Sequence, residues 1–150
     1  MEARLKKIHN YLPTSLETLQ AAAALPQGHG VPGSTLELVH LRVSQINGCG
    51  WCLEYGLGHA KESGLTDKQL VTLAGWRESP HFSDAERAAI ALAEEATRIA
   101  DNPRAVPDDV WDEAARHYDE EALAAIVLHV AMVNLWNRLN VTTRQVAGTW

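Results

Sequence analysis

Two cysteines stand three residues apart in Cys49-Gly50-Trp51-Cys52, and they are the only cysteines among the 150 residues. Thiols at this spacing can close into a disulfide, and at the start of a helix the unpaired backbone N–H groups favour a thiolate. The spacing therefore favours a redox-active dithiol. Two cysteines alone cannot build the disulfide framework of a small secreted protein.

Two other interpretations of the cysteines stay open at this point. A zinc site needs four ligands in a structural centre, or three and a water molecule in a catalytic one. His59 is the only nearby third candidate, so Glu37 or a histidine of a partner chain would have to complete the site. Alternatively, the cysteines are inert and behave as small core residues. A thioredoxin-like dithiol would need a neighbouring strand, and the sequence shows no strand pattern.

The elements that must position these residues are helices, because the apolar residues recur with a helical period and alternating β-branched runs are missing. We therefore predict an all-α fold, a single-domain helical bundle of about six to seven helices over residues 1–150. The predicted helices cover residues 14–25, 34–47, 49–64, 68–74, 84–100, 107–118 and 119–140.

Capping signals and apolar patterns refine this prediction. Ser34 or Thr35 is expected to cap the second helix, Thr66 and Asp67 the fourth and Ser83 the fifth, and Asn102-Pro103 is expected to end the fifth. The second helix is apolar almost all round, which places it at the centre of the bundle. The last helix is too apolar for a monomer's surface, so other helices or neighbouring subunits must enclose it.

Composition and charge exclude several classes of function. The net charge is -6 and no cluster of Lys and Arg is present, so we expect no nucleic-acid partner. No apolar segment follows the first residues as in a signal peptide, which favours a cytoplasmic protein. Residues 122–136 form the longest nearly uncharged stretch, shorter than the roughly 18 residues of a membrane span, and His129 and Asn134 interrupt it. We therefore expect no membrane partner.

The run from Glu37 to Cys52, ELVHLRVSQINGCGWC, resembles the core of the alkylhydroperoxidase D-like branch of the carboxymuconolactone decarboxylase family. The resemblance continues through AGWRESP at residues 74–80 and NLWNRL at residues 134–139. It implies an all-helical homo-oligomer, a trimer or hexamer, that reduces hydroperoxides through a Glu-x11-Cys-x-x-Cys-x3-His motif. It also implies an external dithiol or thioredoxin-like reductant. We expect no cofactor, because no glycine-rich nucleotide motif is present.

The resemblance assigns a role to each matching residue. Glu37 matches the motif glutamate, Cys52 the thiolate that attacks the peroxide, and Cys49 the proton donor and disulfide partner. The residues themselves leave the order of the cysteines open, because a helix terminus favours both thiolates. We expect Glu37 to be buried in its apolar helix, where a carboxylate needs a partner or a raised pKa and can accept a proton.

One motif residue is missing, because Gly56 stands where the family has its relay histidine. His59 lies two helical turns beyond Cys52, about 10 Å away, too far to bond the sulfur directly. His40 is the other candidate, since it follows Glu37 by one turn and shares its face. Both histidines could instead be partly buried polar residues without a catalytic role. Loss of a positioned base typically costs about 10²–10⁴-fold in rate.

The predicted function is therefore a thiol-dependent peroxidase that reduces organic hydroperoxides by a dithiol/disulfide cycle. The alternative is a redox-sensing or small-molecule-binding protein on the same scaffold, weakly active or inactive because of Gly56. Decarboxylation of a lactone also occurs in the wider family, but that branch characteristically lacks the two cysteines. Trp51 either shapes a substrate pocket or packs, and Asn134 and Asn137 are expected to satisfy buried groups or an oligomer contact.

Overall fold

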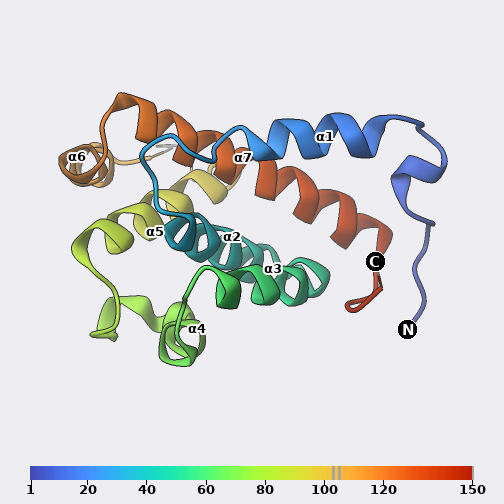
Figure 1. Cartoon of the computed structure of the whole chain (residues 1–150), viewed down its shortest axis with the longest axis horizontal. Helices are drawn as coiled ribbons and strands as arrows, with labels where there is room; N and C mark the ends of the chain where they lie inside the picture. Colours follow the sequence, from blue (N-terminus) through green and yellow to red (C-terminus); the bar gives the residue numbers. More distant parts are fainter. Residues whose placement is uncertain (103, 105, 150) are drawn as a thin grey trace.

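The computed structural model describes residues 1–102, 104 and 106–149, and within these residues the fold is all-helical, as predicted. Figure 1 shows α1 lying along α7, with both chain ends on the same side of the molecule. The elements in order are η1 (Ile8–Asn10), α1 (Ser15–Ala24), α2 (Gly33–Asn47), α3 (Gly50–Glu62), α4 (Asp67–Thr72), η2 (Leu73–Glu78), α5 (Asp84–Thr97), α6 (Asp108–His117) and α7 (Glu120–Thr143).

Helix α2 is the centre of the bundle, as its apolar sequence predicted. It packs against α3, α5 and α7, and its side chains enter both clusters of the hydrophobic core. One cluster joins α2 to α5, α6 and α7, and the other joins it to α3 and η2. The core residues of α2 are Leu36, Leu38, Val39, Leu41 and Val43.

Two predicted boundaries are wrong. Helix α2 begins at Gly33 without a side-chain cap, because its N-cap residue is Pro32, whose side chain has no hydrogen-bond acceptor. Ser34 therefore lies inside the first turn. Helix α5 ends at Thr97, three residues before the predicted end. Of the predicted terminator Asn102-Pro103, the proline lies outside the described residues.

Two other segments are more helical than predicted. Helix α7 continues to Thr143, where Arg144 takes a left-handed conformation (φ 54°) and ends it. The short helix predicted over residues 68–74 is instead α4 followed directly by η2. Gly75 leaves the helical path inside η2 (φ -112°, ψ 37°) and kinks it. The predicted caps at Thr66 and Ser83 are both present as capping boxes.

The buried carboxylate of Glu94 fixes α2 against α5 and η2. It accepts hydrogen bonds from Arg42 Nε (2.6 Å) and Trp76 Nε1 (3.0 Å) and pairs with Arg77 Nη2 (2.8 Å). Burial by itself raises the pKa of Glu94, but hydrogen bonds from Trp76, Arg77 and Arg42 hold it below 4.5. This ion-pair cluster sets the position of the helix that carries Glu37 and His40.

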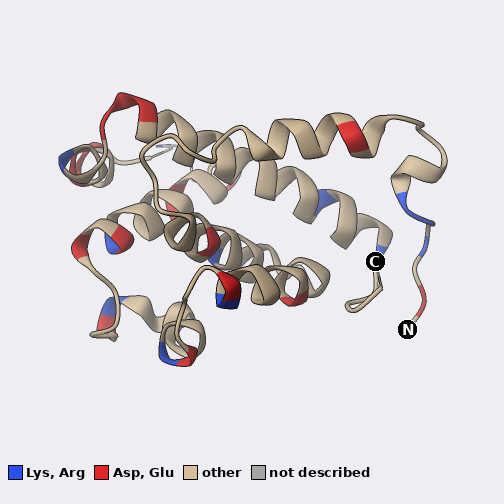
Figure 2. Cartoon of the chain, in the orientation of Figure 1, with Lys and Arg blue, Asp and Glu red and all other residues tan. Residues whose placement is uncertain are grey.

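Helix α7 is long and apolar enough to cross a membrane by length and composition, alone among the helices of the described residues. Half of its most apolar window is buried inside the molecule, as in the core helix of a soluble protein. Figure 2 shows acidic residues gathered at the turn between α6 and α7, while Lys and Arg are scattered over several elements. The fold therefore gives no support to a membrane span.

Candidate active site

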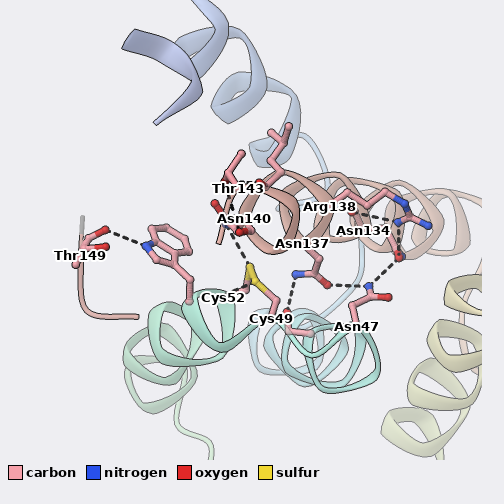
Figure 3. The surroundings of a disulfide bond; sticks show 12 residues. Asn47, Cys49, Cys52, Asn134, Asn137, Arg138, Asn140, Thr143 and Thr149 are labelled. Atoms are coloured by element: carbon pink, nitrogen blue, oxygen red, sulfur yellow. Dashed lines mark hydrogen bonds between the residues drawn. A yellow bond between two sulfur atoms is a disulfide. The ribbon is translucent and has the colours of Figure 1, made fainter. Parts of the chain in front are cut away.

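The two cysteines lie at the N-terminus of α3 and form a disulfide (Figure 3). Cys49 is the N-cap, and its Sγ accepts the backbone N–H of Cys52 at 3.3 Å. Gly48 takes the left-handed conformation (φ 66°) that ends α2 and brings the chain directly into α3. Both side chains are buried, with exposed fractions of 1% and 2%. The predicted placement of a bridging dithiol at a helix start is thus confirmed.

Helix α7 supplies a hydrogen-bond donor to one of the two sulfur atoms. The amide Nδ2 of Asn140 lies 3.4 Å from Cys52 Sγ and points at it across the gap between α7 and α3 (Figure 3). The sequence analysis did not single out this residue. A usable signal existed, because asparagines recur at positions 134, 137 and 140 and form a polar stripe on an otherwise apolar helix.

The other two asparagines of this stripe bind the end of α2. Asn47 donates its amide to Asn134 Oδ1 (3.0 Å) and Asn137 Oδ1 (2.9 Å), and Asn137 Nδ2 donates to Ser44 Oγ (3.1 Å). The expectation that these asparagines satisfy buried backbone groups is confirmed for Asn134, whose Nδ2 donates to the carbonyl oxygen of Val130 (2.9 Å), whereas Asn137 binds the side chains of Asn47 and Ser44. This network holds α7 in a fixed register against the turn that carries the cysteines.

Glu37 and His40 form a pair on α2, as their spacing predicted. His40 Nδ1 lies 3.3 Å from Glu37 Oε2, and the side chains are 14% and 17% exposed, so Glu37 is largely rather than fully buried. A Cβ atom at Gly56 would lie 2.9 Å from His40 Cε1 and 3.1 Å from His40 Nδ1. The imidazole of His40 therefore occupies the space in which a side chain at position 56 would begin.

This space lies on the same face of α3 as Cys52. The buried residues of α3 are Cys52, Gly56 and Ala60, which follow one another at intervals of one helical turn. Neighbours at this spacing have Cβ positions about 5–6 Å apart. The His40 ring thus packs one turn from Cys52, where the family motif would place its own histidine.

His129 of α7 is a further buried histidine beside this pair, and the sequence analysis treated it only as an interruption of an apolar run. Its Nε2 lies 3.0 Å from the carbonyl oxygen of Leu36. Burial, and to a smaller extent the charge of His40, lower the pKa of His129 to about 4, although Glu37 acts in the opposite direction. His129 is therefore neutral at pH 7, and its Nε2–H donates to that carbonyl.

His59 lies apart from these groups. Its side chain is 47% exposed, its Nδ1 is 3.7 Å from Glu62 Oε2, and its ring meets the edge of Tyr55 with centroids 4.7 Å apart. The structure thus brings Glu37 and His40 together beside Gly56 and leaves His59 on the outer side of α3. Within the described residues, no group of three or more His, Cys, Asp or Glu is arranged to hold a metal ion.

The residue between the cysteines connects the site to the C-terminal segment. Trp51 Nε1 donates to the carbonyl oxygen of Thr149 (2.9 Å), and its ring stacks on Tyr55 with centroids 5.2 Å apart. The chain at Gly148 also passes close to the Glu54 carboxylate of α3. The last described residues thus cover the first turns of α3 and help to bury the disulfide.

Fold and site together define an all-helical protein with a Cys-x-x-Cys disulfide at a helix N-terminus. The profile of the carboxymuconolactone decarboxylase family matches residues 12–95. The chain is 36% identical over 108 residues to the uncharacterized protein YdfG of Bacillus subtilis, covering 72% of each. It is 36% identical over 104 residues to the uncharacterized protein YnjA of Escherichia coli, covering 69% of this chain and 55% of YnjA. The chain belongs to the carboxymuconolactone decarboxylase family.

Solved structures confirm the fold. ATU0492 of Agrobacterium tumefaciens, a protein of unknown function provisionally described as the antioxidant defence protein AhpD, superposes with a TM-score of 0.90 and 26% identity. The match covers 99% of this chain and 100% of that one. The debrominase Bmp8 has the same fold, with a TM-score of 0.78 at 20% identity over 93% of this chain and 74% of its own.

Proposed function

We propose that this protein is a thiol-dependent peroxidase that reduces organic hydroperoxides through Cys49 and Cys52. The observation that carries the proposal is the position of His40. Its ring fills the space at Gly56 and pairs with Glu37, one turn from a disulfide-forming cysteine. We propose that His40, from α2, takes the place of the missing motif histidine and keeps a glutamate–histidine pair beside the cysteine-bearing helix.

In the reduced protein, the Glu37 carboxylate orients the imidazole by accepting the Nδ1–H of His40, which leaves Nε2 as the base. His40 draws the thiol proton away from the sulfurs, directly or through water, and the Cys52 thiolate attacks one peroxide oxygen. The O–O bond breaks, the leaving alkoxide takes up a proton to become an alcohol, and Cys52 becomes a sulfenic acid.

The cycle closes through Cys49. Its thiol attacks the sulfenic sulfur, the Cys49–Cys52 disulfide forms, and water leaves. An external dithiol or thioredoxin-like reductant then reduces the disulfide by exchange and is itself oxidised to a disulfide. The disulfide seen in the structure corresponds to the end of this oxidative half-cycle. We propose that the protein works as a homo-oligomer in the cytoplasm.

The test is consumption of an organic hydroperoxide in the presence of a small dithiol. We expect Cys52→Ser to abolish turnover, Glu37→Gln to lower it, and His40→Ala to lower kcat/KM by about 10²–10⁴-fold, as for loss of a general base. His59→Ala serves as the matched control, because its ring lies on the outer side of α3 and should affect the rate less. Turnover that survives in Cys52→Ser would remove the proposed nucleophile.

The same assay separates the proposal from its main alternative. A redox sensor would form one disulfide when treated with one equivalent of hydroperoxide but would not consume further peroxide with dithiol present. Intact mass before and after treatment measures the first step, and peroxide consumption measures the second. Turnover of a lactone in a protein lacking both cysteines would instead indicate the decarboxylase chemistry of the wider family.

A further inference from the structure

The two sulfur atoms of the dithiol have different hydrogen-bond donors. Cys49 Sγ accepts the backbone N–H of Cys52, which belongs to the start of α3. Cys52 Sγ accepts the side-chain amide of Asn140, which belongs to α7. A helix N-terminus favours the thiolate of either cysteine and so does not choose between them. Each sulfur thus has one donor, and Asn140 supplies the one that serves Cys52.

Asn140 is held in place by the rest of the polar stripe on α7. Asn137 and Asn134, about one and two turns earlier, are bound by Asn47 at the end of α2. Because α2 leads through Gly48 directly into Cys49, this network fixes the position of α7 relative to the dithiol (Figure 3). The amide is therefore preorganised toward Cys52 and needs little reordering to serve a charged sulfur.

We propose that Asn140 stabilises the thiolate of Cys52 by donating an amide hydrogen bond to its sulfur, and so promotes attack by Cys52. This inference deepens the proposed function and rests on it only for the identity of the reaction. Asn140 contacts the reacting atom itself, so its role is catalytic rather than structural. A hydrogen bond to a charged group is stronger than one to a neutral group, so the amide stabilises the thiolate more than the thiol.

The experiment titrates each thiol separately by the ultraviolet absorbance of its thiolate, which requires no access of a reagent to the buried sulfur. Cys49→Ser leaves Cys52 as the only thiol, and Cys52→Ser leaves Cys49. Into each background we place Asn140→Leu, which removes the donor at similar volume, and Asn140→Asp, which keeps the shape and presents acceptor oxygens.

We expect Asn140→Leu to move the titration midpoint of Cys52 upward by about one pH unit, so that the thiolate fraction at neutral pH falls about tenfold. Asn140→Asp should move it further, because a carboxylate repels the thiolate. The midpoint of Cys49 should stay nearly unchanged in both variants. Equal shifts for both cysteines would indicate a general change of the helix, and no shift for Cys52 would overturn the proposal.

This outcome is independent of peroxide turnover. If the wild-type protein fails to consume hydroperoxide but Asn140→Leu still shifts the midpoint of Cys52 alone, the proposed function fails and the assignment of Asn140 stands. If peroxide turnover is found but Asn140→Leu leaves the titration midpoint of Cys52 unchanged, the proposed function stands and the assignment of Asn140 fails. The exposed variant Val141→Ala, one residue further along α7, controls for changes in the helix itself.

Discussion

Adding one methyl group to Gly56 is expected to destabilise the protein, whereas the same change at Gly58, two residues along α3, is expected to stabilise it. A Cβ at Gly56 would meet His40 Cε1 at 2.9 Å and Leu41 Cδ2 at 3.1 Å, while a Cβ at Gly58 meets nothing within 4 Å. Neither glycine has a positive φ, so both positions accept alanine in backbone terms. The pair therefore isolates the contact with the neighbouring helix.

The magnitudes follow from two opposing effects. Alanine is favoured over glycine in a helix interior by about 0.8–1.0 kcal/mol, and Gly58→Ala should gain close to this amount. Overpacking a buried position costs about 1–3 kcal/mol, which cancels or exceeds the gain at Gly56. The two variants should thus differ in free energy of unfolding by about 1–3 kcal/mol. In a His40→Ala background most of this difference should disappear, because only the Leu41 contact remains.

Urea or guanidinium unfolding measures these differences for Gly56→Ala and Gly58→Ala in the wild-type and His40→Ala backgrounds, each against its own parent. The m-values are checked for constancy. Peroxide turnover is measured in parallel, because a methyl group that displaces the imidazole should also slow the reaction, while Gly58→Ala should not. Equal stabilisation by both alanines would refute the reasoning, since it would mean that the His40 ring does not occupy the space at Gly56.

Two further predictions concern the polar groups of the core. Because the pKa of His129 is lowered to about 4 in the folded protein from 6.5, the unfolded chain binds more protons between these values. Its stability contribution is therefore complete above pH 6.5 and declines by about 3 kcal/mol as the pH falls towards 4. A His129→Gln variant should show a flatter stability profile from pH 7 to 4, and an unchanged profile would contradict the assignment. Asn47→Ala leaves two buried amide oxygens with fewer donors and should cost about 1–3 kcal/mol on chemical unfolding, whereas the exposed Asn10→Ala should change stability by less than about 0.5 kcal/mol. Equal effects of the two asparagine variants would contradict the inference that the hydrogen bonds of Asn47 stabilise the fold.

Much of the fold could be predicted because apolar residues recur with a helical period, and the capping boxes at Thr66 and Ser83 mark two helix starts. The errors arose where backbone geometry overrides side-chain signals. Pro32 is the N-cap residue of α2, so Ser34 and Thr35 lie inside the helix and do not cap it. Gly75 interrupts a continuous helical pattern through its dihedral angles, which no periodicity reveals.

The site could be predicted only where its residues share one helix. The pairing of Glu37 with His40 follows from a spacing of three residues, and the dithiol from Cys-x-x-Cys. The contacts of Asn140 with Cys52, and of His129 with Leu36, join residues about ninety positions apart and depend on how α7 is placed against α2 and α3. Such long-range contacts leave no local pattern in the sequence.

The filling of one space by His40 rather than by a side chain at position 56 changes how relatives of this chain should be sorted. Under the proposed mechanism the site requires an imidazole in a given volume, and we propose that either of two helices can supply it. A glycine at the end of Cys-x3-Gly is then a sign of loss only when no histidine follows the motif glutamate by three residues. Searching for Glu-x2-His together with Cys-x3-Gly would group chains that a search for Cys-x3-His divides.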